Sequence, residues 1–297
     1  MMRHAYLITA NTNWKLLELF LQTLDRAENT FFLLIDGKVK TPLSELIQVK
    51  LSKSQLVEVP RIEINWGGYS QIQAELNLLQ AAIIGKYDYY HFLQGSDFPI
   101  KSPAKIDAFF RENKGNEFVQ FSPDGYEFAK WKCCYYHILI ENRFYRNSKI
   151  LKAINHGSIL IQKKLNLTRK QPNLFHGSAL FSITHDCALY VLESQEKIKR
   201  MFSKTCAADE VFLQTIIMQS PFRNSIYHFE KQDGHARYID WVHKKGNSPK
   251  TMQLSDFQML IELPEQYCFA RKLTDAEIDL ALKIVSTFKN NKVPLDD

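Results

Sequence analysis

The sequence predicts an α/β protein, with a sheet flanked by helices in a single domain over residues 1–297, and two observations carry this prediction. Short apolar runs typical of buried strands alternate with stretches in which apolar residues recur at helical spacing. The chain also shows no Pro-, Gly- or Ser-rich linker, no internal repeat and no low-complexity tract. Its 297 residues are enough to bury a substantial core.

The first third of the chain predicts alternating strands and helices. We predict strands over residues 4–10, 30–36, 61–65 and 88–94, and helices over residues 14–25, 70–85 and from about Ser102. The opening β-α-β order implies a parallel pair with a right-handed crossover. Gly67 and Gly68 mark the turn between the third strand and its helix.

The middle of the chain, residues 120–170, is less regular and combines aromatic with basic residues. We interpret it as helix and loop that form a flexible cover. Regular spacing returns at residues 175–192, which predict a turn, a strand and a helix. Residues 207–222 predict another helix, with Asp209 and Glu210 in its first turn, where the helix dipole favours anions.

Polar side chains follow three of the predicted strands. Asn11 and Thr12 follow the first strand, Asp36 ends the second, and Asp97 closely follows the fourth. Ligands of open α/β sheets bind at the carboxyl ends of the strands. The candidate site is therefore expected at this edge.

Composition narrows the classes of function. The net charge is +6 without dense runs of Lys or Arg, which disfavours nucleic acid as a partner. A scattered basic excess fits an anionic small substrate and an anionic membrane surface equally well. The aromatic content of 12% has two explanations: the aromatic side chains fill the core, or they line a cleft for sugars or bases.

The cysteines and the apolar runs bear on location. The five cysteines form no C-x-x-C pair, which favours free thiols in a reducing cytosol. The chain starts without a signal peptide, and no apolar stretch has the length of a membrane span. We therefore expect a cytoplasmic protein.

Several catalytic motifs are absent from the sequence. It contains no G-x-x-x-x-G-K-[ST], G-x-G-x-x-G or G-x-S-x-G, which lowers the expectation of a kinase, dehydrogenase or α/β hydrolase. It also lacks any Asp-x-Asp pair and any H-x-x-x-H pair. No metal site and no cofactor are expected.

An ordered set of motifs resembles one known family. The segments are HAYLITAN, FFLLID, INWGGYSQIQAELNLL, YYHFLQGSDFPIKS, HGSALFSIT, ADEVFLQTIIMQSPF, RYIDW, GNSPKTM and CFARKL. Together, over roughly residues 3–275, they resemble the core-2/I-branching glycosyltransferase family (glycosyltransferase family 14), and the chain looks like a compact bacterial-type member.

The resemblance implies a GT-A-like fold with a Rossmann-like mixed sheet, in which residues 1–115 mainly bind nucleotide and residues 116–297 mainly serve the acceptor and catalysis. It further implies a UDP-sugar donor, inversion at the anomeric carbon and no metal. UDP-GlcNAc is the first candidate for the donor, and UDP-xylose, UDP-glucuronic acid or another UDP-hexose are the alternatives. Lys250 in SPKTM and Lys272 in FARKL match basic residues that bind the leaving diphosphate. Without the resemblance, each would be interpreted as a solvated surface charge.

Glu210 matches the carboxylate that takes the proton of the acceptor hydroxyl, with Asp209 as an orienting neighbour. A helix-terminal acid that only favours the dipole is the structural alternative for both. On the donor nucleotide, the resemblance places four kinds of contact. Trp66 stacks on uracil, Asp36 contacts the uridine part, Asn11 and Thr12 bind base or ribose, and Asp97 shapes the site or merely caps a helix or loop.

The resemblance assigns the acceptor to Trp241, Glu117, Lys130 and Lys132, with core packing as the alternative for Trp241. We expect no N-terminal anchor of the kind found in animal relatives, and the five cysteines do not match the disulfide set of those relatives. We therefore expect a bacterial acceptor, a glycan or lipid-linked saccharide in surface polysaccharide synthesis, with peripheral association at the inner face of the membrane.

Two other hypotheses stay open. A non-catalytic protein on the same fold would bind a UDP-sugar or glycan without using Glu210 as a base. A basic RNA- or membrane-binding module is suggested only by the net charge and the Lys- and Tyr-rich segments.

Overall fold

The computed structural model describes residues 1–123, 125–171, 173–231 and 234–290, and within them two sheets are present. The larger has six strands in the order β3-β2-β1-β4-β7-β6, and the smaller has three in the order β5-β9-β8. The strands are β1 (His4–Ala10), β2 (Asn29–Ile35), β3 (Gln55–Glu58), β4 (Tyr89–Gln94), β5 (Asp97–Pro99), β6 (Phe118–Phe121), β7 (Gly177–Thr184), β8 (Arg237–Ile239) and β9 (Phe269–Arg271).

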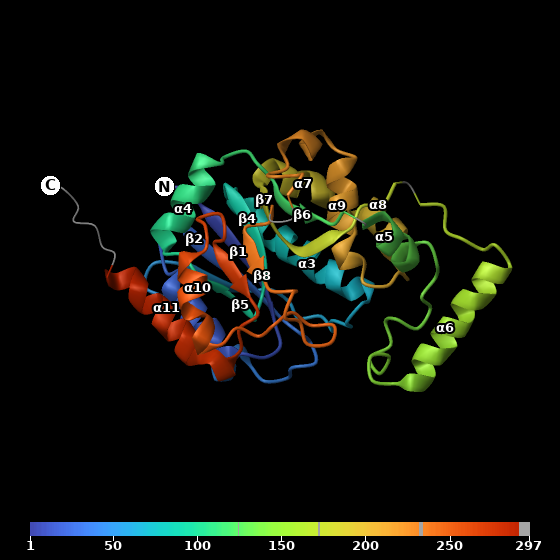
Figure 1. Ribbon diagram of the computed structural model, residues 1–297, viewed down its shortest axis with the longest axis horizontal. Helices are drawn as coiled ribbons and strands as arrows, with labels where there is room; N and C mark the ends of the chain where they lie inside the picture. Colours follow the sequence, from blue (N-terminus) through green and yellow to red (C-terminus); the bar gives the residue numbers. More distant parts are fainter. Residues whose placement is uncertain (124, 172, 232–233, 291–297) are drawn as a thin grey trace.

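Helices lie on both faces of the larger sheet (Figure 1). The α-helices are α1 (Trp14–Thr23), α2 (Leu43–Leu46), α3 (Tyr69–Ala82), α4 (Pro103–Glu112), α5 (Gly125–Cys133), α6 (Lys149–Lys164), α7 (His185–Glu193), α8 (Gln195–Phe202), α9 (Phe212–Met218), α10 (Phe257–Glu262) and α11 (Ile278–Asn290). Short 3-10 helices are η1 (Ile83–Gly85), η2 (Ala208–Glu210), η3 (Pro221–Ser225), η4 (Leu254–Asp256) and η5 (Asp275–Glu277).

The larger sheet is mixed. β3, β2, β1 and β4 run parallel, β7 is antiparallel to β4, and β6 is antiparallel to β7. The parallel strands end level with one another, because Ala10 pairs with Ile35 and Thr9 pairs with Gln94. The α/β prediction, with a sheet flanked by helices, is confirmed.

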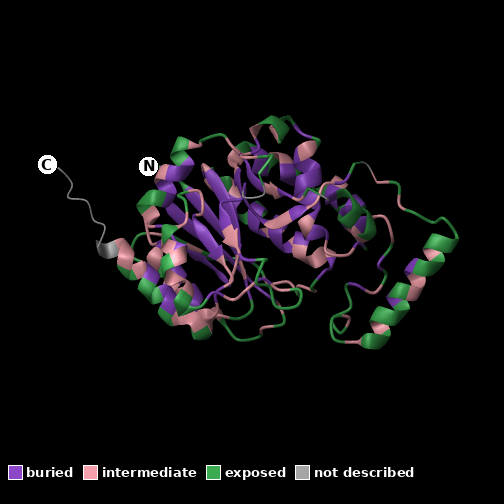
Figure 2. Ribbon diagram, in the orientation of Figure 1, coloured by how far each residue is buried: buried purple, intermediate pink, exposed green. Residues whose placement is uncertain are grey.

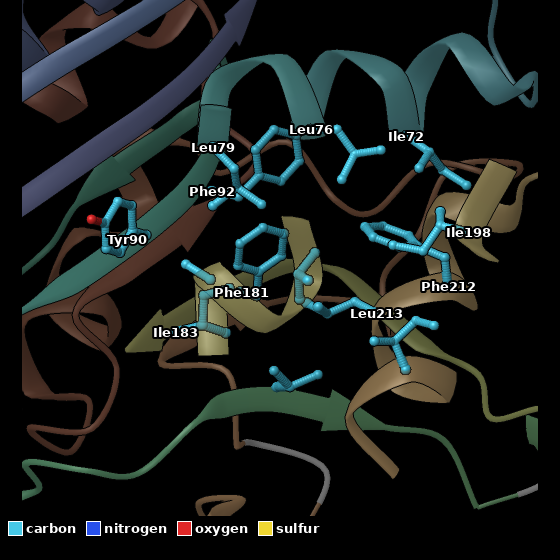
Figure 3. Close-up of a cluster of buried hydrophobic side chains, with 14 of the residues drawn as sticks. Ile72, Leu76, Leu79, Tyr90, Phe92, Phe181, Ile183, Ile198, Phe212 and Leu213 are labelled. Atoms are coloured by element: carbon cyan, nitrogen blue, oxygen red, sulfur yellow. The ribbon is translucent and has the colours of Figure 1, made fainter. Parts of the chain in front are cut away.

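Side chains alternate between two buried cores, as the pleat of a strand requires. In β1, Leu7 belongs to the core under α3, α7 and α9, whereas Tyr6 belongs to the core under α1, α4 and α11. Figure 3 shows the first core, where Leu79 of α3 lies close to Phe92 of β4 and Phe181 of β7. The rings of Phe92 and Phe181 stack with their centroids 5.4 Å apart.

A crevice is expected between the carboxyl ends of β1 and β4. From β1 the chain continues to β2 on one side of this pair, whereas from β4 it continues to β6 on the other side. The strand order therefore reverses between β1 and β4, which is the topological switch point where open α/β sheets bind ligands.

A buried arginine joins the two sheets. Arg237 of β8 is only 1% exposed. Its Nη2 donates to the carbonyl oxygens of Phe181 (2.7 Å) and Phe92 (3.3 Å), and its Nη1 donates to Ser182 Oγ (2.7 Å). Its guanidinium also lies over the ring of Phe269 in β9, 5.3 Å from the centroid. The smaller sheet is therefore held against β4 and β7.

The predicted strand at residues 61–65 was wrong, because the third strand of the large sheet is β3, a few residues earlier. The segment after Pro60 bonds to the loop that follows β2 instead of to a ladder. The N–H of Gly37 donates to the Ile62 carbonyl (2.8 Å), and the N–H of Ile64 donates to Asp36 Oδ1 (3.3 Å).

The predicted helix at residues 207–222 was wrong at its start. Asp209 and Glu210 lie in the 3-10 helix η2, and α9 begins only at Phe212. Val211, with φ −132° and ψ −37°, interrupts the helical backbone between them. Neither carboxylate thus occupies the first turn of an α-helix, and the dipole argument for them does not apply.

The segment from residue 134 to 170 forms an arm built around α6, which lies away from the sheets (Figure 1). This agrees with the helix and loop expected there. In the part of the chain that the structure describes, no helix combines the length and apolar character needed to cross a membrane.

Replacing Arg237 with alanine should destabilise the fold. The change removes the hydrogen bonds that the guanidinium donates to Ser182 Oγ and to the Phe181 carbonyl, and hydrogen bonds to charged groups contribute about 1.5–3 kcal/mol each. We expect Arg237→Ala to lower the free energy of unfolding in urea by at least about 2 kcal/mol. Arg223→Ala, at an exposed position in η3, should stay within about 0.5 kcal/mol of wild type. Equal losses of unfolding free energy in both variants would contradict the role of Arg237 in joining the two sheets.

Candidate active site

The loops that follow β1, β2, β4 and β9 meet at the carboxyl edge of the sheet. The N–H of Gly95 donates to the Thr9 carbonyl (2.9 Å), and the N–H of Asp36 donates to the Ala10 carbonyl (2.9 Å). The N–H of Leu273 donates to the Ser96 carbonyl (2.9 Å). The structure therefore brings the first two predicted loops together with the segment that carries Lys272.

Asn11, Thr12 and Asp36 lie at this edge in different environments. Asn11 and Thr12 are exposed. Asp36 is largely buried, and its Oδ1 accepts from the N–H of Lys38 (3.0 Å) and of Ile64. Asp36 therefore links the loop after β2 to the segment after Pro60 through its own hydrogen bonds. Its role toward a nucleotide stays a prediction.

Asp97 is placed where it cannot reach a ligand. Its side chain is 0% exposed, its Oδ1 accepts from Arg271 Nη1 (3.0 Å), and its Oδ2 accepts from the N–H of Gln94 (2.7 Å). Both oxygens are bonded inside the protein, so a part of Asp97 in the donor site, which stays a prediction, would be indirect. Asp97 instead orients Arg271, which also donates to Gln94 Oε1 (2.5 Å).

Lys250 and Lys272 are brought side by side along the backbone. The N–H of Met252 donates to the Lys272 carbonyl (2.8 Å), and the N–H of Lys250 donates to the Asp240 carbonyl (2.9 Å), which closes the loop that carries Trp241. The Nζ of Lys250 lies 2.7 Å from Asp256 Oδ1, and this hydrogen bond raises the pKa of Lys250. An ammonium has three donors, so one bond to Asp256 leaves others for a ligand.

The loop that carries Glu210 is held from two sides. The N–H of Ala207 donates to the Gly67 carbonyl (2.7 Å), next to Trp66, and the N–H of Cys206 donates to the Lys132 carbonyl (3.0 Å). The turn at Trp66, the end of α5 and η2 therefore form one cluster. Trp66 is 53% exposed, so its ring is free to stack on a planar group, although Arg146 lies over it at 5.5 Å.

Glu210 forms a close cluster with Lys132 and His176. Lys132 Nζ donates to Glu210 Oε2 in a short ion pair, and it lies 3.0 Å from His176 Nε2. His176 Nε2 lies 3.3 Å from the same Oε2, while its Nδ1 is 3.1 Å from Ser122 Oγ. Among the described residues these contacts end on Oε2, and the Glu210 side chain is 39% exposed, so Oε1 can accept another proton donor.

The cluster keeps Glu210 ionised. Burial opposes the charge, but the hydrogen bond from His176 and the charge and hydrogen bond of Lys132 outweigh it and hold the pKa of Glu210 below its ordinary value. A proton on Nε2 of His176 makes the bond to Glu210, whereas a bare Nε2 accepts from Lys132. Glu210 is therefore held as a carboxylate whose Oε1 is open to a proton donor.

Asp209 has the opposite electrostatic environment. It is 7% exposed, and burial together with the charge of Glu210 raises the pKa of Asp209 to about 7, against the opposing charge of Lys132. Its Oδ2 accepts from Gln71 Nε2 (2.8 Å), and Gln71 also binds the N–H of Gly67. Burial and then Asp209 likewise raise the pKa of Glu75 well above its ordinary value. Asp209 thus supports Glu210 from below and keeps its proton up to a pH of about 7.

A family model for the core-2/I-branching enzyme matches residues 4–260. The chain belongs to the core-2/I-branching enzyme family. The predicted resemblance is confirmed, and the mixed sheet flanked by helices is consistent with the GT-A-like fold that it implied.

Individual relatives in this family are distant. A beta-1,3-galactosyl-O-glycosyl-glycoprotein beta-1,6-N-acetylglucosaminyltransferase of Bos taurus is 25% identical over 258 residues, covering 83% of this chain and 57% of the relative. The protein of that name in Homo sapiens is 23% identical, with 83% and 56% covered. The chain thus spans little more than half the length of these curated relatives, both of which are named as glycosyltransferases.

The prediction for Glu117 is corrected in this core-2/I-branching chain. It is 1% exposed, and its oxygens accept from the N–H (2.9 Å) and Oγ1 (2.5 Å) of Thr184. Thr184 pairs with Tyr89 at the start of β4, so Glu117 lies at the edge opposite the crevice. Buried and bonded there, it cannot contact an acceptor.

The remaining acceptor residues lie on two elements. Lys130 is exposed on α5, two residues before Lys132 and therefore on roughly the opposite side of the helix, and Trp241 is 52% exposed on the loop closed at Lys250. Exposure of Trp241 excludes the core-packing alternative. Acceptor contacts of Lys130, Lys132 and Trp241 stay predictions, with Lys132 now also a partner of Glu210.

Sequence reasoning missed His176 and Arg271. His176 precedes Gly177, where a side chain could not fit, because its Cβ would lie 1.8 Å from the Gln120 carbonyl oxygen. The HGSALFSIT motif contained the signal, since His176 stands at the start of a predicted strand within a motif of the family. Arg271 lies beside Lys272 in FARKL, and nothing in the sequence pairs it with Asp97.

Asp209→Asn should change how stability depends on pH. The folded state holds the Asp209 proton up to a pH of about 7, whereas an unfolded Asp releases it near pH 4, so the folded state binds more protons between these values. Stability from this group is therefore present at low pH and lost as pH rises through 7. Between pH 5 and pH 8, wild type should lose more free energy of unfolding than the variant, by on the order of 2 kcal/mol.

The measurement is urea unfolding of both proteins at the two pH values, with the exposed Asp279→Asn on α11 as control. The control should follow wild type. Parallel pH dependence of wild type and Asp209→Asn would show that Asp209 titrates normally.

Proposed function

We propose that this chain is an inverting, metal-independent glycosyltransferase that moves a sugar from a UDP-sugar to a hydroxyl of a glycan or lipid-linked saccharide. The first candidate for the transferred sugar is GlcNAc. The observation that carries the proposal is the ionised Glu210 held by Lys132 and His176 beside the turn of Trp66. Family membership and the acetylglucosaminyltransferase names of the relatives support the reaction class and the donor sugar.

In the proposed reaction, Glu210 Oε1 accepts the proton of the acceptor hydroxyl as its oxygen attacks the anomeric carbon. The new glycosidic bond forms on the face opposite the leaving group, the bond from the anomeric carbon to the diphosphate oxygen breaks, and UDP leaves with its electron pair. Lys250 and Lys272 stabilise the negative charge that develops on the diphosphate. The absence of an Asp-x-Asp pair and the adjacent backbones of these two lysines support this role.

The acceptor and its setting are also part of the proposal. Exposed Trp241 offers an aromatic face for a sugar ring, and exposed Lys130 offers a cation on the helix that also carries Lys132. We place the enzyme in the bacterial cytoplasm, in surface polysaccharide synthesis, with peripheral contact at the inner face of the membrane. The basic and aromatic arm supports that contact.

A second candidate is a non-catalytic UDP-sugar- or glycan-binding protein on the same fold. The internal partners of two key groups favour it: Lys132 occupies Glu210 Oε2, and Asp256 occupies Lys250. Binding of a UDP-sugar without turnover on a broad acceptor panel would support this candidate over the enzyme.

Glu210→Gln should abolish transfer and keep donor binding. The amide cannot take a proton at neutral pH, and loss of a general base lowers rates by about 10²–10⁴-fold. Turnover of UDP-GlcNAc would be measured by UDP release, and donor binding by calorimetry. Glu193→Gln, at an exposed position on α7, is the matched control and should retain full activity. Full activity in Glu210→Gln would remove Glu210 from the mechanism.

Lys272→Met and Lys250→Met should each weaken UDP binding in EDTA. A hydrogen bond to a charged group contributes about 1.5–3 kcal/mol, which corresponds to about a 10- to 100-fold loss of affinity. A thermal-shift panel of UDP and UDP-sugars in EDTA, with Lys199→Met on α8 as control, measures the effect. If wild type bound UDP only after manganese was added, the proposed binding of the diphosphate by the two lysines would be wrong.

A further inference from the structure

One face of α6 is occupied by contacts within the arm. Asn155 is buried, and its Nδ2 lies 3.3 Å from both His137 Nδ1 and Tyr145 OH. Gln162 accepts from the N–H of Tyr136 (2.8 Å) and donates to its carbonyl (2.9 Å). These contacts fix which side of the helix faces inward.

Another face of α6 is apolar and open to solvent. The α6 stripe consists of Ile150, Ile154, Ile161 and Leu165, which recur at helical spacing and are 51–73% exposed. Figure 2 shows most of the helix exposed, apart from its inward residues. Phe144 and Leu167 add further exposed apolar area at the two ends.

The positive charge of the protein is concentrated in the same region. The whole chain has 38 Lys and Arg and 32 Asp and Glu, and residues 126–170 hold 10 of the basic residues but only 2 of the acidic ones. The rest of the chain therefore has 28 basic and 30 acidic residues. The net charge of the whole chain, +6, therefore comes entirely from this segment. Lys149, Lys152, Lys163 and Lys164 are the exposed cations on α6 itself.

We propose that the α6 stripe and its lysines dock on the surface of an anionic lipid bilayer. A bilayer interface satisfies both features at once, because it takes up apolar side chains beneath its negatively charged headgroups. A soluble polyanion would meet the lysines but leave the stripe in water. A second copy would cover the stripe but bring two strongly basic segments together.

The docking surface is connected to the predicted donor site. Arg146, which precedes α6, lies over the Trp66 ring. Glu141 Oε1 accepts from the N–H of Ser70 (2.9 Å), and its Oε2 accepts from Ser70 Oγ (2.9 Å), at the start of α3. The arm that carries the docking surface is therefore attached to the turn of Trp66 and to the start of α3. The docking assigns a surface to the peripheral membrane contact that is part of the proposed function, and its service to a lipid-linked acceptor rests on that function as well.

Vesicle flotation tests the proposal on the full chain, using phosphatidylcholine alone and phosphatidylcholine with phosphatidylglycerol. Wild type should bind the anionic vesicles at least about tenfold more than neutral ones, because each cation near such a surface contributes about fivefold to partition. The stripe variant Ile150→Ser/Ile154→Ser/Ile161→Ser and the charge variant Lys149→Gln/Lys152→Gln/Lys163→Gln/Lys164→Gln should each lose most of this binding. Added salt should weaken wild type as well.

Ile84→Ser/Leu282→Ser is the matched control, because both residues are exposed and apolar but lie far from α6 in the sequence. Circular dichroism melts establish that all variants fold. Binding by the α6 variants equal to wild type, or no preference of wild type for anionic vesicles, overturns the proposal. Self-association that disappears in the stripe variant, without vesicle binding, would overturn it in favour of a second copy. None of these readouts needs transferase activity, so failure of the proposed enzyme and failure of docking are distinguishable.

Discussion

The buried guanidinium of Arg237 is the contact on which the arrangement of the two sheets depends. It bonds to β4 and β7 of the larger sheet while its own strand, β8, pairs with β9. Burying a charge is costly unless it is hydrogen-bonded, and both Nη atoms of Arg237 donate to the larger sheet, so the smaller sheet has little freedom to shift. Because Lys250 follows β8 and Lys272 follows β9, this joint sets where both lysines stand relative to the carboxyl ends of β1 and β4.

Two adjacent carboxyls acquire opposite character from their surroundings. Glu210 is partly exposed and lies against Lys132 and His176, so it stays ionised. Asp209 points into the protein toward Gln71 and near Glu75, so it retains its proton at higher pH. Environments that separate the pKa values of neighbouring acids are typical of acid–base sites. The same geometry explains why Asp209 suits support and Glu210 suits proton transfer.

Much of the fold was predictable because apolar runs of strand length and helical spacing are local properties. β1, β2, β4, α1 and α3 were predicted within a few residues. The strand at 61–65 failed because β-pairing requires a partner, and that segment bonds to the loop after β2. Among site residues, Glu210, Lys132 and Trp66 do converge, whereas Glu117 and Asp97 are buried by partners, Thr184 and Arg271, that lie far away in the sequence.

The sequence by itself determined the α/β class, the family and the excess of cations in residues 126–170, because these depend on residue order and composition alone. Only the tertiary structure decided which charges meet, that His176 joins Glu210, and that the α6 stripe faces solvent. The physical reason is that pKa, accessibility and ligand contact depend on burial and on neighbours across the fold, and linear spacing does not specify either of them.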